Sequence, residues 1–204
     1  MVEALIFDYG GVVSDGGRDF EPAMRLASNL AIGQSCAIQL ISEPWDQLSK
    51  GFIDVDEFWS QIENALGSEV DDTLRDIWNT FDNCMYPRKQ IQVTLMNLKT
   101  SGYILGLLSD TVPPTAQSIR LGGGYHPFDF TILSCEVGLR KPDEKIYNVA
   151  LSKIPDISPH NVVYIDDNPK NLVPARKLGM QTILAGNSKD LSIEIINIMS
   201  NKAV

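Results

Sequence analysis

The sequence has few of the side chains that bind metals through nitrogen or sulfur. Its 204 residues include two histidines, His126 and His160, and three cysteines, Cys36, Cys84 and Cys135. An odd number of cysteines without a short Cys-x-x-Cys spacing argues against a disulfide framework and against a zinc site. We therefore expect reduced, partly buried thiols, and neither a histidine-based metal site nor a catalytic histidine.

Basic residues and long apolar runs are also scarce. Seventeen lysines and arginines face 26 aspartates and glutamates, which gives a net charge of -9. Proteins that bind nucleic acid need a basic face, and no run of Lys and Arg supplies one. No stretch approaches the ~20 apolar residues of a membrane span, and the first residues show no basic segment followed by a long apolar run. We expect a cytoplasmic monomer or homodimer that binds neither nucleic acid nor membranes.

Short apolar runs that end in polar residues recur along the chain. They are Ala4–Phe7 before Asp8, residues 104–108 before Ser109-Asp110, Phe130–Leu133 leading toward Arg140-Lys141, and residues 162–165 before Asp166-Asp167. From Pro87 onward such runs alternate with helical patterns, and the last run is at 182–184. This alternation predicts an α/β fold with a Rossmann-like parallel sheet that is covered by helices on both faces. We expect the polar residues to gather at one edge of the sheet, where the carboxyl ends of parallel strands meet.

Residues from about 20 to 84 carry helical periodicity and no convincing strand. Apolar residues recur there at three and four positions, and Asp54 followed by Glu57 predicts the start of one helix. We predict a core domain of residues 1–16 and 86–204, and a helical cap of residues 17–85 that lies over Asp8. The tryptophans are expected in the core of this cap: Trp45, Trp59 and Trp78.

The polar residues at the strand ends together fit one chemical plan. Asp8 would attack phosphorus as a nucleophile, while Ser109 and Lys141, with Asp110 beside them, would hold the phosphoryl oxygens. The four aspartates at these ends face Lys141 alone, so a phosphate dianion would be repelled unless a cation came with it. Magnesium suits oxygen ligands. The expected metal site consists of Asp8, the Gly10 carbonyl, Asp167 and Asp166.

The same motifs resemble those of the haloacid dehalogenase superfamily, in the branch with a small helical cap after the first motif. The matching segments are Phe7-Asp8-Tyr9-Gly10-Gly11-Val12, Leu108-Ser109-Asp110-Thr111, Arg140-Lys141-Pro142 and Tyr164-Ile165-Asp166-Asp167-Asn168. The resemblance extends over nearly the whole chain and is shared with sugar-phosphate phosphatases and with the phosphatase domain of soluble epoxide hydrolases. It implies a Mg²⁺-dependent phosphatase that hydrolyses a small phosphorylated metabolite, such as a sugar phosphate, through an aspartyl-phosphate intermediate.

Gly10 departs from the family pattern. Most phosphatases of the superfamily have a second aspartate there, which protonates the leaving alkoxide and then deprotonates the attacking water. Such a group contributes about 10² to 10⁴ in rate. A related set of sugar-phosphate phosphatases also carries glycine at this place, and the family uses the backbone carbonyl of this residue for magnesium. Three substitutes for the missing acid stay open: Asp15, Asp110 and a metal-activated water.

The main alternative is a catalytically weak or inert homologue that binds a phosphorylated ligand or a partner protein. Gly10 favours it, as does Asp110, where the family more often has asparagine. The retained nucleophile, lysine and acidic pair favour the enzyme. A dehalogenase would lack the acidic pair, a phosphomutase would need the second aspartate, and a two-component receiver domain would carry its acidic pair early in the chain.

Overall fold

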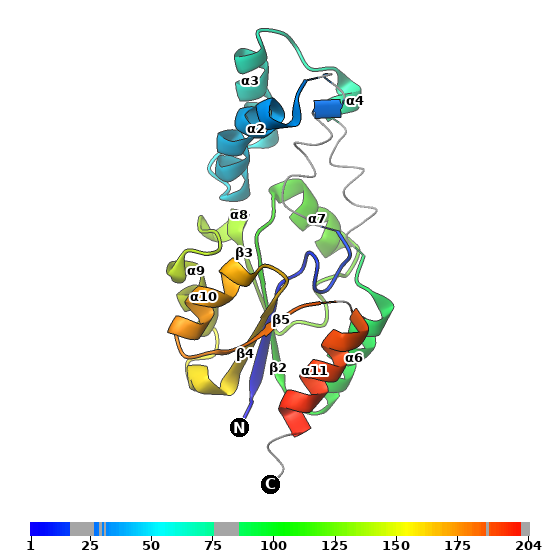
Figure 1. The fold of residues 1–204 in the computed structure, drawn as a ribbon, viewed down its shortest axis with the longest axis vertical. Coiled ribbons are helices and arrows are strands. Elements are labelled where there is room, and N and C mark those ends of the chain that lie inside the picture. Colours follow the sequence, from blue (N-terminus) through cyan, green and yellow to red (C-terminus); the bar gives the residue numbers. More distant parts are fainter. Residues whose placement is uncertain (17–26, 29, 31, 76–85, 187, 201–204) are drawn as a thin grey trace.

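The computed structural model describes residues 1–16, 27–28, 30, 32–75, 86–186 and 188–200. A five-stranded sheet of order β3-β2-β1-β4-β5 lies at its centre (Figure 1). The strands are β1 (Ala4–Phe7), β2 (Ile104–Ser109), β3 (Phe130–Leu133), β4 (Val162–Asp166) and β5 (Gln181–Leu184). Every neighbouring pair is parallel, so the predicted parallel α/β sheet is confirmed.

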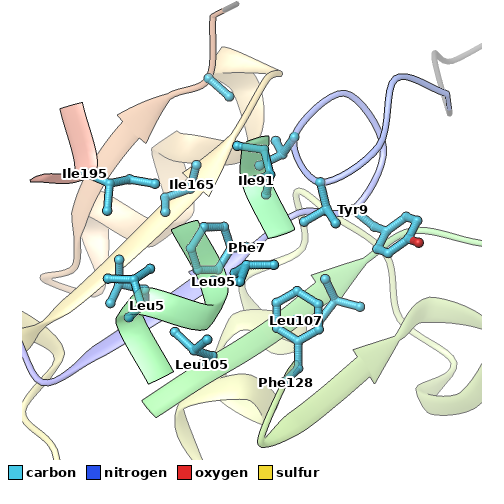
Figure 2. Packing of buried hydrophobic residues seen from close by; sticks show 14 of the residues in the cluster. Leu5, Phe7, Tyr9, Ile91, Leu95, Leu105, Leu107, Phe128, Ile165 and Ile195 are labelled. Carbon is cyan, nitrogen blue, oxygen red and sulfur yellow. The ribbon is translucent and has the colours of Figure 1, made fainter. Parts of the chain in front are cut away.

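Helices cover both faces of the sheet, as predicted. Leu5 and Phe7 of β1 face a cluster completed by α6, α7 and α11, part of which is drawn in Figure 2. Ala4 and Ile6 face the other cluster, which α9 and α10 complete. Successive side chains of a strand point to opposite faces, so a strand that is buried on both faces is apolar throughout. The helices of this part, with one short 3-10 helix, are α6 (Lys89–Thr100), α7 (Pro113–Leu121), α8 (Ser134–Val137), α9 (Glu144–Leu151), η1 (Pro159–Asn161), α10 (Pro169–Lys177) and α11 (Ser188–Ser200).

The strand order determines where a ligand can bind. β1 is the middle strand, with β2 on one side and β4 on the other. The chain builds β2 and β3 outward on one side and then returns to build β4 and β5 on the other side. Ligands of open α/β sheets bind beyond the carboxyl ends of the strands at such a switch point. Asp8 directly follows the last residue of β1 and therefore lies at this point.

Helices α2 (Gln34–Ser49), α3 (Val55–Leu66) and α4 (Asp72–Arg75) form a separate group beyond one end of the sheet (Figure 1). The Asp54 carboxylate accepts a hydrogen bond from the Glu57 backbone N–H at 2.8 Å, which confirms the predicted start of α3. Trp59 is buried among the apolar residues of this group, and Trp45 is half-buried against them. Trp78 and Cys84 lie outside the described residues, as do most residues at both ends of the insert. The domain boundaries at 16/17 and 85/86 remain predictions.

The described residues on the two sides of the insert are hydrogen-bonded to each other. Ser14 and Pro87 form an antiparallel β-bridge, and the Arg88 backbone N–H donates to the Val13 carbonyl at 2.8 Å. The Arg88 guanidinium adds hydrogen bonds of 2.6 Å to the carbonyl oxygens of Gly11 and Val12. The chain therefore leaves the core and returns to it at one place, next to the turn that follows Asp8.

The group of α2, α3 and α4, called the cap below, contacts the rest of the described chain, the core, through a glycine and an apolar side chain. Gly51, after α2, has a φ of +69°, and a Cβ there would lie 2.1 Å from the Cys135 carbonyl oxygen in α8. Val112, from the loop after β2, belongs to the apolar cluster of the cap. The cap therefore rests on the segments that follow β2 and β3.

The observed elements differ from the predicted ones mainly in their ends and in α8. The strands expected at 4–7 and 130–133 have the observed ends, those at 104–108 and 162–165 extend one residue further, and the last strand begins one residue earlier. The short helices α8 and η1 were not predicted. A helix of four residues carries no periodicity from which to predict it. Within the described part of the chain, no helix combines the length and hydropathy that a membrane span needs.

We predict that Gly51→Ala destabilises the protein more than Gly67→Ala does. Gly67 has nearly the same φ, +70°, but nothing lies within 4 Å of its Cβ position. Both alanines incur the left-handed backbone cost, about 1 kcal/mol, whereas only the one at position 51 meets a backbone oxygen. We expect losses of about 1 kcal/mol for Gly67→Ala and about 3 kcal/mol for Gly51→Ala in urea unfolding. Equal losses would contradict the close approach of the cap.

Candidate active site

Asp8 is held by hydrogen bonds of its backbone N–H and of its carboxylate. Its N–H donates to the Ile165 carbonyl at 2.8 Å, so pairing with β4 continues one residue past β1. The Tyr9 N–H donates to Asp8 Oδ1 at 2.7 Å. The Lys141 ammonium lies 2.8 Å from the same oxygen, and both side chains are buried. The predicted nucleophile and the predicted lysine are therefore in direct contact.

Asp166 is buried completely and surrounded by donors. Its Oδ2 accepts hydrogen bonds from Lys141 Nζ at 2.9 Å and from the Tyr164 hydroxyl at 2.5 Å. Its Oδ1 accepts from the Asn168 N–H at 2.8 Å, and the Asn171 amide reaches both oxygens at 3.0 and 3.1 Å. This arrangement compensates a buried charge and fixes the lysine between two carboxylates.

Tyr164 and Asn171 were not predicted as parts of the site. Tyr164 stands two residues before Asp166 on β4, so the two side chains share one face of the sheet. Asn171 lies in the first turn of α10, where it can return to the strand end. The sequence could have indicated Tyr164, because a residue two positions before Asp166 on a strand lies on the same face. The role of Asn171 depends on where α10 packs, which the sequence does not indicate.

Asp167 is the exposed member of the acidic group. Carboxylate oxygens of Asp8, Asp166 and Asp167 all lie within 4.8 Å of one another. Gly11 allows this approach, because a Cβ at its φ of +70° would lie 2.2 Å from Asp167 Oδ2. Three carboxylates at this separation, with oxygen donors only, fit a hard divalent cation such as Mg²⁺.

The electrostatics also favour a cation at this place. Burial raises the pKa of Asp8 from 3.8 to about 8, and the carboxylates of Asp166 and Asp167 add to the rise while Lys141 opposes it. Burial alone would lower the pKa of Lys141, but the attraction of Asp8, Asp166 and Asp110 raises it above its usual range. Lys141 is therefore an ammonium ion. A divalent cation beside Asp8 would favour the ionised carboxylate that a nucleophile requires.

Ser109 is the last residue of β2, and Asp110 follows it directly. The Ser109 hydroxyl is buried and lies 3.5 Å from the Asp110 carbonyl oxygen, at the long limit of a hydrogen bond. Asp110 Oδ1 accepts from the Lys141 backbone N–H at 3.0 Å, and its Oδ2 lies 3.5 Å from Arg140 Nε. The Asp110 carboxylate thus joins the end of β2 to the loop that carries Lys141.

Gly10 and Asp15 lie in the turn that leads away from Asp8. Gly10 forms an isolated β-bridge with Ser14. The Asp15 side chain is 81% exposed and pairs with Arg88 Nε at 3.4 Å. Arg88 was not predicted, although it secures this turn. Of the residues predicted for the site, Asp8, Lys141, Asp166, Asp167 and Asp110 lie close together in the structure. Asp15 instead pairs with Arg88.

The chain matches a family of hydrolases and is similar to two further named proteins. A family model described as "Haloacid dehalogenase-like hydrolase" matches residues 51–185. Drimenol cyclase from Aspergillus calidoustus is 28% identical over 210 residues, and the chain spans 38% of its length. D-ribitol-5-phosphate phosphatase from Bacteroides thetaiotaomicron is 24% identical over 207 residues, which cover 98% of this chain and 100% of that protein.

The fold is shared with a solved structure. It is that of a HAD family enzyme from Bacteroides thetaiotaomicron, a complex with magnesium and inorganic phosphate. The TM-score is 0.69 at 24% identity, and the match covers 91% of this chain and 95% of the other.

We predict stability effects of different size for the two adjacent aspartates when divalent ions are removed with a chelator. Asp166→Asn should lower the free energy of unfolding by about 3 kcal/mol, because Lys141 and the other donors lose a buried charged acceptor. Asp167→Asn should change it by less than about 1 kcal/mol, since Asp167 is exposed and its charge repels Asp8. Urea unfolding measures both. Similar losses would contradict the different roles of these two carboxylates.

Proposed function

Because the chain belongs to the haloacid dehalogenase-like hydrolase family, we propose that it is a Mg²⁺-dependent phosphatase acting on a small phosphorylated metabolite. The observation that carries this proposal is the contact of the buried Asp8 carboxylate with the Lys141 ammonium, beside an acidic cluster fit for a cation. The similarity to D-ribitol-5-phosphate phosphatase over the whole of that protein supports it and favours a sugar or polyol phosphate.

In the proposed reaction an oxygen of Asp8 attacks the phosphorus of the ester. The bond from phosphorus to the alcohol oxygen breaks, its electron pair leaves with that oxygen, and the resulting alkoxide takes a proton from water. Water then attacks the aspartyl phosphate, which releases inorganic phosphate and restores the Asp8 carboxylate. Lys141, fixed by Asp166, supplies positive charge to the phosphoryl oxygens, and the Ser109 hydroxyl donates a hydrogen bond to them.

The metal would be held by Asp8, Asp167 and the Gly10 carbonyl. When bound, Mg²⁺ neutralises the charge that the nucleophile and the phosphate share. Asp166 belongs to the same cluster, but both of its oxygens already accept hydrogen bonds. Its larger contribution in this proposal is therefore to hold Lys141.

Gly10 leaves the alcohol without the usual acid at that position. Esters with good leaving groups lose least from this, because their departing oxygen needs less protonation. Acyl phosphates and anomeric sugar phosphates are of this kind. We therefore propose that activated esters are turned over faster than simple alkyl phosphates.

The first prediction for this proposal concerns phosphate release. We expect Mg²⁺-dependent release from at least one small phosphorylated metabolite in a panel that includes D-ribitol 5-phosphate, acyl phosphates and anomeric sugar phosphates. Asp8→Asn should abolish the release, since the amide oxygen is a poor nucleophile, while circular dichroism stays unchanged. Binding of phosphate esters without any turnover would instead support the inert homologue.

A second prediction concerns the missing acid. We expect Asp15→Asn to change turnover at saturating substrate by less than about twofold, because the side chain is 81% exposed and pairs with Arg88. A group that acted as general acid would cost about 10² or more when removed. A loss of that size would identify Asp15 as the substitute for the absent aspartate.

A further inference from the structure

Arg140 lies between a carboxylate of the cap and a carboxylate of the core. Its Nη1 donates to Asp46 Oδ1 in α2 at 3.2 Å, and its Nε lies 3.5 Å from Asp110 Oδ2 after β2. The side chain is 22% exposed, so solvent screens these pairs less than it screens pairs on an open surface. One guanidinium therefore connects the cap to the edge of the sheet.

Asp110 transmits this connection to the catalytic lysine. Its second oxygen, Oδ1, accepts from the Lys141 backbone N–H at 3.0 Å. The same carboxylate thus holds two consecutive residues of one loop, Arg140 by its side chain and Lys141 by its backbone. The Lys141 ammonium then contacts Asp8 at 2.8 Å. A continuous series of polar contacts therefore runs from Asp46 in the cap to the nucleophile.

The contact between Arg140 and Asp110 is an ion pair without a hydrogen bond. Arg140 Nε is buried and makes no hydrogen bond to the described residues, although Asp110 lies 3.5 Å away. A buried donor without an acceptor is unfavourable, so a small movement that shortens this distance is favoured. A cleft of about 400 Å³ lies beside the arginine and leaves room for such a movement. Its walls come from both parts of the molecule, Asp46, Lys50 and Phe52 from the cap and Arg140, Lys141 and Pro142 from the core.

We propose that Arg140 is a positioning residue that couples closure of the cap to the placement of Lys141. When the cap closes over a phosphate ester, the Asp46–Arg140–Asp110 bridge shortens and holds the lysine loop against the phosphoryl group. The inference rests on the proposed phosphatase function, because it assigns a task to this bridge in substrate binding. Breaking the bridge weakens binding of the ester and leaves the chemical step largely unchanged.

The test compares three single variants with one double variant. Arg140→Gln removes the bridge, Asp46→Asn removes its end in the cap, and Asp110→Asn removes the charge at its core end. The amide oxygen introduced by Asp110→Asn can still accept from the Lys141 N–H. With Mg²⁺ and the best substrate, we expect each variant to raise KM about five- to tenfold, with the kcat of Arg140→Gln and of Asp46→Asn within about threefold of wild type.

The double variant Asp46→Asn/Asp110→Asn separates a bridge from two independent contacts. We expect its KM to match that of the single variants, since either change already breaks the bridge. Effects that multiply would overturn the proposal, and so would an unchanged KM in all three single variants. Arg120→Gln is the matched control, because Arg120 pairs with Glu136 within the core, and it should leave KM unchanged.

A second readout does not need turnover. Trp45 is half-buried in the cap next to Asp46. In a protein whose other two tryptophans are replaced by phenylalanine, the fluorescence of Trp45 should report cap closure when inorganic phosphate is titrated with Mg²⁺. We expect the Kd of phosphate to rise about five- to tenfold in the same variants. If the wild-type protein binds phosphate and releases it from esters, but the variants show the same Kd and KM as wild type, the coupling is refuted and the proposed function is not. Wild-type protein that neither binds phosphate nor releases it would refute the proposed function.

The unfolding free energies of Asp46→Asn, Arg140→Gln and their double variant test the bridge in either case. A loss in the double variant that is smaller than the sum of the two single losses supports the bridge. A loss equal to that sum overturns it.

Discussion

The site depends on one buried ammonium group held between two carboxylates. Lys141 reaches Asp8 on one side and Asp166 on the other, and all three side chains are buried at the edge of the sheet. Buried charges are stable only when their partners are fixed and satisfied. The neighbouring elements supply this: β4 brings Asp166 and Tyr164, α10 brings Asn171, and Asp110 anchors the lysine backbone. The parallel sheet makes the arrangement possible, because it brings segments far apart in the sequence to one edge.

The strands and the central site residues could be predicted from the sequence for a common physical reason. A strand buried on both faces must be apolar along its whole length, so a charged residue directly after it stands out. Asp8 and Asp166-Asp167 are of this kind, and Lys141 follows in a loop with a recognisable sequence. The family match agrees with the resemblance that these motifs carry.

The supporting residues could not be predicted in the same way. Arg88, Arg140 and Asn171 are polar residues in helices and loops, where polar residues are ordinary. Their roles depend on distances that only the packed structure determines, such as the 2.6 Å contacts of Arg88 with two carbonyl oxygens. Gly11 is a similar case. A glycine turn was evident from the sequence, but the need for glycine comes from Asp167, which lies 156 positions later and occupies the space of the missing side chain.

The hydrogen bonds at the base of the insert have a consequence for how this architecture can vary. Ser14 pairs with Pro87, and Arg88 binds the backbone on the other side of the junction, so the core itself holds the two junction segments together. The entropic cost of closing a loop grows only slowly with its length once its ends are fixed. Segments of different length or helix content can therefore be exchanged at this junction without disturbing Asp8. The contacts that hold the turn after Asp8 therefore do not depend on the length of the segment inserted there.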